Sequence, residues 1–528
     1  MSLTRQLVTL GRLATRLPGF LRQRVTLEEA RAQLRRRLDE REANFLDVAE
    51  RGIYAHPESP YLPLLRAAGC ELGDLRASVR THGLEGALSS LRDAGVYVTF
   101  EEFKGRSRIE RNGVVVETGH GTFHNPLSER FFTTRSSGST GAPVEGAHDL
   151  AHILSGVPSR MISCDAHGVL GAPLGLWRCA PPLGAGTRHV LQSIVMGNVA
   201  RRWFAPMGSD EVPSDLGTRL TTEVVLRECR LFGHPVPFPE PVPFERAVVV
   251  ARWAAETARA DGRCLIRTGL SMAMRVAAAA EDAGFGLEGV TFMAGGEPPT
   301  PAKVGRIRAS GAKYVPHYGG SDMGQVGAGC ANPENESDVH FMEDNLALLQ
   351  VPQSLHGFDT SVDAFCFTTL NATAGRLLLN VELDDFGVIE RRSCGCPFDQ
   401  LGFKTHIWRV RSYRKLTGEG INLLDGEMLR ILEEVLPSRY GGDPHDYQLH
   451  EREDPDGFTR LVLVVDPRID LPDEADVIDV LLGTLAAGDL YADSAREHWK
   501  QGASFRIERR EPEWLARGKF PSLIVHRV

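Results

Sequence analysis

The sequence predicts an α/β protein, with a large N-terminal α/β domain and a small α+β C-terminal domain. Three observations predict this organisation. The chain has 528 residues, which is too long for one ordinary hydrophobic core. Expected helices and strands alternate from residue 244 onward, and the pattern changes past about residue 408. We therefore expect one domain over residues 1–408 and a second over residues 409–528.

The first clear element is a helix expected over residues 26–52. Thr26 and Glu29 form a capping box, and the apolar residues that follow keep helical spacing. The segment before it is rich in arginine and free of acidic residues. That segment fits an amphipathic helix lying on its own domain, with a membrane-surface helix, a partner helix or a transit peptide as alternatives. The many prolines between residues 204 and 243 favour a long ordered loop over a strand.

The alternating region contains two strands that end in glycine. Helices expected over 244–260 and 271–284 precede a buried strand, "GVTFMAGG", at 289–296. A capped helix over 300–311 then leads to a second strand, "AKYVPHYGG", at 312–320. Ligands of α/β sheets bind at the carboxyl ends of the strands. The two strands therefore predict one binding site.

The C-terminal region has a different pattern. Helices are expected over 425–436 and 473–487, and strands over 460–466 and 504–510. Few elements in a short segment predict a small, separate α+β domain.

Composition and charge exclude several classes of protein. Hydrophobic residues make up 42 % of the chain and charged residues 24 %, and the net charge of −9 gives no basic excess for binding nucleic acid. No run of about 18 apolar residues predicts a membrane span, and no secretory signal is evident, so we expect a cytoplasmic protein. Nine cysteines, an odd number, argue against a disulfide framework.

A loop rich in glycine and hydroxyl groups, "TTRSSGSTGAPVEG", occupies residues 133–146. Its backbone N–H groups and hydroxyls could surround phosphate oxygens, although a flexible linker has the same composition. The lysine of a P-loop is missing, because no Gly-Lys-Ser/Thr sequence occurs in the chain. A phosphate site here would therefore not be of the Walker type.

Four stretches carry a family resemblance when they are taken in order. They are "SSGSTGAPV" (136–144), "AGGEPPTP" (294–301), "HYGGSDMG" (317–324) and "ELDDFGVIE" (382–390). Together they resemble the adenylate-forming superfamily of acyl- and aryl-CoA ligases, and most closely its phenylacetate-CoA ligase branch. The resemblance implies a large multi-sheet adenylation domain and a small mobile C-terminal domain. It also implies a hinge near 411–415, where "RSYRKLTGEGIN" (411–422) is similar to the family's linker.

The resemblance assigns roles in binding MgATP. It places the β- and γ-phosphates at Ser136, Ser137, Gly138, Ser139, Thr140 and Gly141. It places the adenine along Gly295, Gly296, Glu297 and Pro298, with Tyr318 stacked on the ring. It implies that Ser321 contacts a phosphate, Asp322 helps hold Mg²⁺, Asp385 binds the ribose, Arg411 contacts ribose or phosphate, and Lys519 acts on the substrate carboxylate and α-phosphate.

Three positions depart from the family pattern. Many members have lysine where this chain has Val144, Asp322 is one methylene shorter than the usual glutamate, and Leu383 with Asp384 replaces the usual Thr-Gly. These departures support an alternative in which the chain binds nucleotide without turnover.

A pocket for the acid is implied by the same resemblance. Its expected lining is Trp203, Phe204, Phe232, His234, Thr268, Met272, Ala294 and His317. Such a lining favours an aromatic or medium-sized acid.

Cysteine and histidine residues in the second half of the chain suggest a metal site. Cys330, His340, Cys394 and Cys396 are of the types that zinc prefers, and four protein ligands make a closed structural site. The alternative is a set of reduced, partly buried cysteines. Some relatives of phenylacetate-CoA ligase carry a similar zinc site, so the resemblance favours structural zinc.

The function that the resemblance implies is ATP-dependent activation of a small carboxylic acid as an acyl-adenylate. Transfer to CoA or an acyl carrier protein would follow, with an amine or a protein cysteine as the alternative acceptor, and a homodimer is one expected assembly. A serine hydrolase is not expected, because the chain lacks a Gly-x-Ser-x-Gly elbow.

Overall fold

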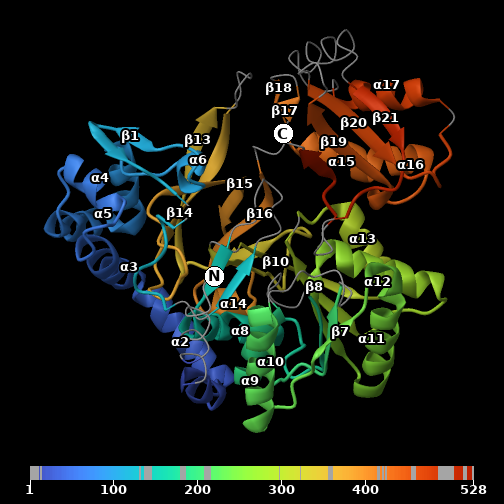
Figure 1. The fold of residues 1–528 in the computed structure, drawn as a ribbon, viewed down its shortest axis with the longest axis horizontal. Helices are drawn as coiled ribbons and strands as arrows, with labels where there is room; N and C mark the ends of the chain where they lie inside the picture. The colour runs from blue at the N-terminus through green and yellow to red at the C-terminus, as the bar shows by residue number, and fades with distance from the viewer. Residues whose placement is uncertain are drawn as a thin grey trace.

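A computed structural model describes most of the chain (Figure 1). The described residues are 11, 15–119, 121–129, 132–135, 145–178, 186–206, 216–296, 298–320, 323–354, 361–412, 417–418, 421–422, 425–453, 459–471, 473–485, 505–514 and 520–525. Within these ranges, no helix combines the length and the apolar composition needed to cross a membrane.

A layer of helices forms the N-terminal part. Its members are α2 (Leu27–Asp39), α3 (Arg41–Ala49), a π-helical turn (Glu50–Tyr54), α4 (Tyr61–Ala67), α5 (Leu72–Asp93) and α6 (Phe100–Phe103). The predicted capping box is confirmed, because the Thr26 hydroxyl accepts from the Glu29 amide at 3.2 Å and the Thr26 amide donates to the Glu29 carboxylate at 2.8 Å. The single helix expected over 26–52 is wrong, since the chain leaves helical geometry at Glu40 and starts a new helix there.

A twelve-stranded sheet runs through the molecule, in the order β13-β14-β15-β16-β12-β11-β10-β9-β8-β5-β6-β7. One half of it is parallel. Its strands are β5 (Leu174–Trp177), β6 (Arg202–Ala205), β7 (Pro239–Pro241), β8 (Cys264–Gly269), β9 (Val290–Gly295) and β10 (Lys313–Gly320). The two glycine-ended strands that the sequence predicted are β9 and β10, and they are neighbours.

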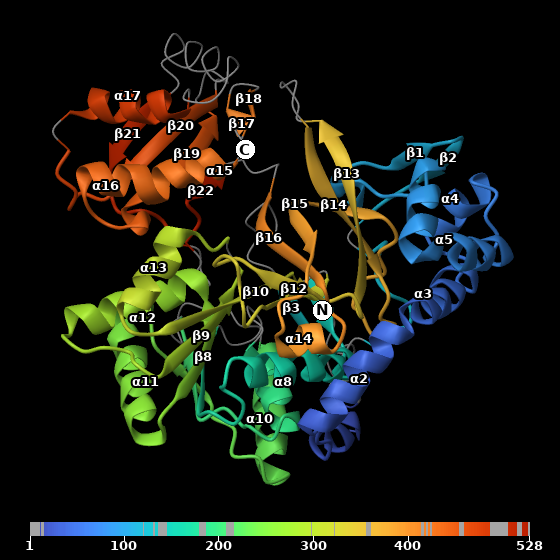
Figure 2. The same cartoon turned by 180° about the vertical axis from the view of Figure 1, so that it is seen from behind.

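Helices cover both faces of the parallel half (Figures 1 and 2). They are α7 (Leu150–Ser155), α8 (Val157–Ala166), α9 (Gly186–Val195), α10 (Leu216–Leu231), α11 (Ala247–Asp261), α12 (Leu270–Asp282) and α13 (Pro301–Ala309). Along β8, Ile266 packs with α11 and α12, whereas Leu265 packs with α8 and α9. This alternation confirms the predicted α/β layers. The long loop expected over 204–243 is wrong, because α10 and β7 lie within that range.

The other half of the sheet is antiparallel. Its strands are β11 (Gly324–Gly329), β12 (Val339–Phe341), β13 (Leu346–Ser354), β14 (Ser361–Thr369), β15 (Val381–Arg391) and β16 (Thr405–Ser412), with α14 (Pro397–Gln400) between the last two. Strand β15 begins at Val381, directly after Asn380, which has a positive φ of 51°. The Asn380 side chain donates there to the carbonyls of Leu88 and Val96.

The C-terminal unit is a separate α+β structure, as predicted. Its four-stranded sheet has the order β21-β20-β19-β22. Its elements are α15 (Asp425–Arg430), a π-helical turn (Ile431–Val435), α16 (Leu436–Tyr440), β19 (Tyr447–Glu453), β20 (Thr459–Val465), α17 (Glu474–Leu485), β21 (Phe505–Arg509) and β22 (Leu523–Val525). A hydrophobic core of its own lies between the sheet and these helices. Short hairpins β1 (Ile109–Arg111) with β2 (Val114–Val116), β3 (Phe132–Arg135) with β4 (Glu145–His148), and β17 (Thr417–Gly418) with β18 (Ile421–Asn422) complete the strands.

Polar contacts join α13 to the C-terminal unit. Lys303 forms an ion pair of 2.7 Å with Glu433, and both side chains are almost fully buried, at 3 % and 0 % exposure. Ser522 donates to the same Glu433 oxygen at 2.9 Å. One turn along α13, Arg306 pairs with Asp443. The surface between the two units is therefore held by buried charges as well as by apolar packing.

Candidate functional site

A cavity opens at the carboxyl ends of β9 and β10, where the sequence predicted a binding site. It has a volume of about 210 Å³. Segments far apart in the sequence line it: the loop after β9, the end of β10, and the strands β15 and β16. Among its lining residues are six that the sequence singled out, namely Gly296, Pro298, His317, Tyr318, Asp385 and Arg411. The fold thus brings together the described part of the predicted nucleotide site.

Tyr318 and Asp385 are directly bonded in this cavity. The Tyr318 hydroxyl donates to the Asp385 carboxylate at 2.7 Å. Burial raises the pKa of Tyr318 well above its ordinary value, and the negative charge of Asp385 raises it further. The phenol therefore stays protonated and holds the carboxylate in place from one side.

Arg411 contributes a cation to the same cavity. It lies on β16 opposite Phe386, next to the pair formed by Asp385 and Ser412. Its Nη1 atom is buried and has no hydrogen-bond partner within the described residues. A buried guanidinium donor without a partner is costly, so the cavity offers a favourable position for a ligand oxygen.

Gly295 lies where β9 and β10 come closest. A Cβ atom at this position would lie 1.9 Å from the carbonyl oxygen of His317, a backbone atom that cannot rotate away. Only glycine lets the two parallel strands pair here. The following residue, Gly296, has a positive φ of 91°, and that conformation turns the chain along the wall of the cavity.

We expect Gly295→Ala to destabilise the protein by about 3 kcal/mol and to impair any ligand binding in the cavity, because the added methyl group must separate β9 from β10. Urea unfolding followed by circular dichroism measures this change. Gly305→Ala, in helix α13 with open space around the added methyl group, is the matched control. It should be neutral or stabilising by about 0.5–1 kcal/mol. Equal stability of the two variants would contradict the close approach.

Several predicted residues lie outside the described residues. They are Ser136, Ser137, Gly138, Ser139, Thr140, Gly141, Glu297, Ser321, Asp322 and Lys519.

The residues expected to form the acid pocket lie in several parts of the structure. Trp203, Phe204, Thr268, Met272 and Ala294 are buried in the packing between the sheet and its helices. Phe232 lies against Arg22, and His234 bonds to the carbonyl of Leu21 at 3.0 Å, near the N-terminal helices. His317 lines both the cavity at the ends of β9 and β10 and a smaller cavity beside it.

A group of arginines lines two further cavities, one of which shares residues with the cavity at the ends of β9 and β10. We call it the arginine pocket, and its members are Arg160, Arg178, Arg188 and Arg267. They come from α8, from the end of β5, from α9 and from β8. In the sequence Arg160, Arg178 and Arg188 are isolated arginines, so no local motif marks them.

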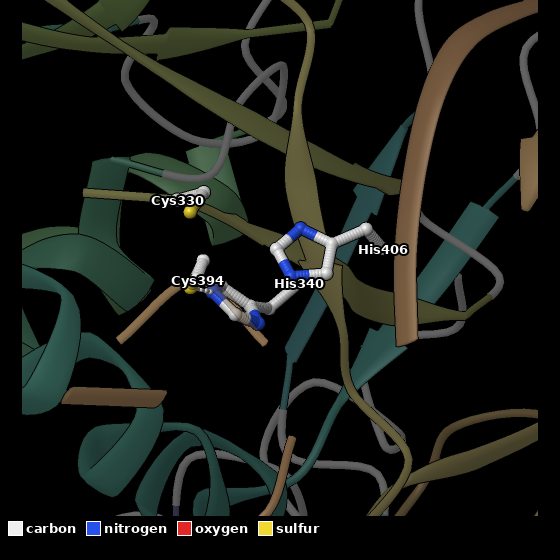
Figure 3. Close-up of side chains that lie close together, drawn as sticks. All are labelled: Cys330, His340, Cys394 and His406. Carbon is white, nitrogen blue, oxygen red and sulfur yellow. Dashed lines mark hydrogen bonds between the residues drawn. The ribbon is translucent and has the colours of Figure 1, made fainter. Parts of the chain in front are cut away.

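A second cluster lies beside the antiparallel half of the sheet (Figure 3). Ligand atoms of Cys330, His340, Cys394 and His406 lie within 4.8 Å of one another. Figure 3 shows the four side chains converging from the end of β11, from β12, from the segment before α14 and from β16. Cys396, the fourth predicted ligand, also joins the cluster, because its Sγ lies 3.0 Å from Nε2 of His340.

His340 is oriented as a metal ligand would be. Its Nδ1 atom bonds to the carbonyl oxygen of Phe403 at 2.9 Å, which leaves Nε2 facing Cys394 at 3.5 Å and Cys396 at 3.0 Å. Tetrahedral zinc places nitrogen and sulfur ligands about 3.5 Å apart, given bonds of about 2.0 and 2.3 Å. A hydrogen bond from Cys330 and another from His340 lower the pKa of the Cys396 thiol to about 2 against the effect of burial. Thiolate is the form that binds metal.

His406 is a member of the cluster that the sequence reasoning missed. It is paired in register with His340 across β12 and β16, and the two ring centroids are 4.1 Å apart. Its Nδ1 bonds to Asp338 at 2.7 Å, and its buried Nε2 has no partner in the described chain. Carboxylate–histidine pairs of this kind commonly support metal sites. The strand register is the signal that would have found it, because no sequence spacing links His406 to the cysteines.

The chain has the fold of the adenylate-forming ligases. No family model matches it, and no curated protein matches it in sequence. Among solved structures it is similar to 2-hydroxyisobutyryl-CoA ligase in the postadenylation state in complex with R3-HIB-AMP. The TM-score is 0.52 and the identity 14 %, over 93 % of this chain and 89 % of that one.

Two further solved structures are similar with lower scores. The same ligase in complex with 2-HIB-AMP gives a TM-score of 0.48 at 15 % identity, over 93 % of this chain and 89 % of that one. An amide bond synthetase from Marinactinospora thermotolerans gives 0.38 at 11 % identity, over 90 % and 91 %. The first comparison alone exceeds 0.5, and at its level of identity it establishes a common fold.

Proposed function

We propose that the protein is an ATP-dependent carboxylate ligase of the phenylacetate-CoA ligase-like branch, which activates an acid as its acyl-adenylate. One observation carries this proposal: Tyr318, Asp385 and Arg411 line one cavity at the carboxyl ends of the parallel strands. The family resemblance assigns Tyr318 to the adenine, Asp385 to the ribose, and Arg411 to the ribose or the phosphate. An aromatic ring, a carboxylate and a guanidinium are the groups that such a ligand requires.

In the proposed first step, an oxygen of the substrate carboxylate attacks the α-phosphorus of ATP, and the bond to pyrophosphate breaks. Asp385, held by the Tyr318 hydroxyl, accepts hydrogen bonds from the ribose hydroxyls. Arg411 donates to the ribose or the phosphate, and Lys519 neutralises charge on the carboxylate and α-phosphate. The protein contributes positioning and charge neutralisation and no covalent nucleophile.

The phosphates belong, in this proposal, to the hydroxyl-rich loop of residues 136–141. Ser321 contacts a phosphate, and Asp322 helps hold the Mg²⁺ that neutralises the phosphate oxygens. Glu297 completes the adenine segment that begins at Gly295.

The second step transfers the acyl group to a thiol, and AMP leaves. CoA or an acyl carrier protein is the proposed acceptor, and the reaction is assigned to the cytoplasm. A movement of residues 409–528 about a hinge near 411–415 would let one active site serve both steps. The alternative acceptor, an amine or a protein cysteine, uses the same first step and differs only in the nucleophile.

We further propose that the cysteine–histidine cluster holds a structural zinc ion. Cys330, His340, Cys394 and Cys396 would be its four ligands, because Nε2 of His340 faces both Cys394 and Cys396 and the three thiols lie together. Four protein ligands leave no open position, so the ion would stabilise structure without entering the reaction. It would tie β11 and β12 to the segment after β15.

Pyrophosphate release from MgATP tests the proposed activity. The assay covers a panel of acids, with and without CoA, and uses Lys519→Ala as the variant that lacks the proposed catalytic cation. We expect acid-dependent release that this variant loses by at least about 100-fold, since it lacks a charge that stabilises the transition state. CoA-independent release that requires an amine would favour the alternative acceptor. Tight ATP binding without release for any acid would favour a non-catalytic nucleotide-binding protein.

A further inference from the structure

The arginine pocket lies where the acid would have to sit. Along β8, β9 and β10, Arg267, Met293 and His317 share the face of the sheet that is covered by α8 and α9. Helix α8 places Arg160 over this face. The pocket shares Pro316 and His317 with the cavity at the ends of β9 and β10, which holds the nucleotide in the proposed function. An acid whose carboxylate reaches the nucleotide would therefore extend toward these arginines.

The pocket consists of two adjoining cavities. Arg160 and Gln325 line both, and each has a volume of about 30 Å³. One water molecule needs about 10–15 Å³ measured in this way, so each cavity has room for a compact group of two or three heavy atoms. The dimensions suit a carboxylate or phosphate end better than an aromatic ring.

Three of these arginines have no carboxylate partner within the described chain. Within the described chain, Arg160, Arg188 and Arg267 form no ion pair with aspartate or glutamate, although Arg160 and Arg267 are only 5 % and 7 % exposed. The Nε atoms of Arg160 and Arg188 are buried and lack hydrogen-bond partners among the described residues. Arg160 bonds to Nδ1 of His189 at 3.2 Å, and Arg267 contacts the Cys164 sulfur at 3.6 Å.

The remaining polar groups of the pocket are neutral. Burial, followed by the charge of the arginines, lowers the pKa of His189 and His317 well below the ordinary value, and lowers that of His152 to about 4. Burial and the neighbouring arginines also lower the pKa of Arg160. Among the described residues, Arg160, Arg188 and Arg267 thus concentrate positive charge without a paired carboxylate, which is a costly arrangement unless a ligand supplies a negative group.

We propose that the substrate acid carries a second anionic group, a carboxylate or a phosphate, which binds Arg160, Arg188 and Arg267. This inference rests on the proposed function and names its substrate class. A single reacting carboxylate brings one negative charge and must lie at the nucleotide, so it cannot neutralise the arginines as well. The inference departs from the aromatic or medium-sized acid that the sequence favoured.

Matched pairs of acids test the inference. Pyrophosphate release is measured for glutarate against valerate, and for 3-phosphoglycerate against glycerate, so that each pair isolates one anionic group and the two pairs distinguish carboxylate from phosphate. We expect kcat/KM to be about 100-fold higher for the doubly anionic member of at least one pair. Arg160→Met should remove most of this preference, and Arg308→Met, at an exposed position of α13, should retain it.

Thermal unfolding without ATP gives a second measurement that does not depend on turnover. The preferred dianion should raise the unfolding temperature of the wild type and not that of Arg160→Met. Without any ligand, Arg160→Met should unfold at a higher temperature than the wild type, because it removes an unbalanced buried charge. A lower unfolding temperature would show that the arginine has a structural role, and would overturn the inference. If Arg160→Met does not fold, Arg188→Gln replaces it in both measurements.

The outcomes separate the inference from the proposed function. Equal use of mono- and dianionic acids, with no stabilisation by either dianion, overturns the inference and leaves the proposed function intact. Stabilisation by inorganic pyrophosphate that depends on Arg160, with no preference among acids, assigns the arginines to the leaving group and also overturns it. Stabilisation by a dianion that depends on Arg160, without turnover of any acid, supports the anion site and counts against the proposed function.

Discussion

Asp385→Ala is expected to lower kcat/KM for ATP by about 100-fold, because the variant loses charge-assisted hydrogen bonds to the ribose hydroxyls. The carboxylate lines the cavity and is fixed by the Tyr318 hydroxyl at 2.7 Å. Steady-state kinetics of pyrophosphate release at varied ATP concentration measures the effect.

Two controls identify the ribose as the partner. Tyr318→Phe removes the hydroxyl and keeps both the ring and the carboxylate, so we expect a loss of about 10-fold or less. With 2′-deoxy-ATP, the wild type should lose activity, whereas Asp385→Ala should lose little more, because its contact is already missing. A full additional penalty for 2′-deoxy-ATP in the variant would show that Asp385 does not bind this hydroxyl.

Cys330→Ser is expected to abolish zinc binding and to lower the free energy of unfolding by about 3 kcal/mol or more. Without the zinc ion, the buried imidazole of His340 and the two remaining thiols would have no common ligand-binding partner. Each unsatisfied buried polar group costs about 1–3 kcal/mol. Metal analysis of the purified protein and urea unfolding measure the two effects. Removal of zinc from the wild type by a chelator should produce the same loss of stability.

The chain offers a matched control for this variant. Cys70 is half-buried, lies outside the cluster and bonds to Tyr54, so Cys70→Ser should keep both the zinc and the stability. His406→Gln tests the fifth donor: we expect zinc to be retained with weaker affinity, because His406 is adjacent to the four proposed ligands. Full retention of stability in zinc-free wild-type protein would refute a structural role for the metal.

Local sequence signals predicted much of the fold. The structure contains the capping box of Thr26 and Glu29, the predicted helices α11, α12 and α13, and the two strands that end in glycine. Each of these features depends on residues that are only a few positions apart. Helix α10 was missed for a local reason of another kind. Helix α10 precedes the prolines of residues 235–243, and the loop predicted from these prolines was extended over the helix.

Only part of the candidate sites could be predicted from the sequence. The order of the motifs was enough to name Tyr318, Asp385 and Arg411 as parts of one site, and in the structure all three line one cavity. Their contacts with one another could not be predicted in this way. His406 enters the metal cluster only through its register with His340, and the arginine pocket joins residues from α8, α9 and β8. Pairing between distant strands and packing between helices and sheet decide these neighbours, and neither is encoded in the spacing of a local motif.

The buried pair of Lys303 and Glu433 has a consequence for the proposed movement of the C-terminal unit. An apolar surface of the same size would lose its stabilisation on exposure to water, whereas two separated charges regain hydration as they part. Hydration of the two separated charges thereby offsets much of the attraction that is lost when the ion pair breaks. Such a contact favours one orientation of the C-terminal unit while the ion pair is formed, and at this point the proposed movement would expose charged groups to water and not apolar ones.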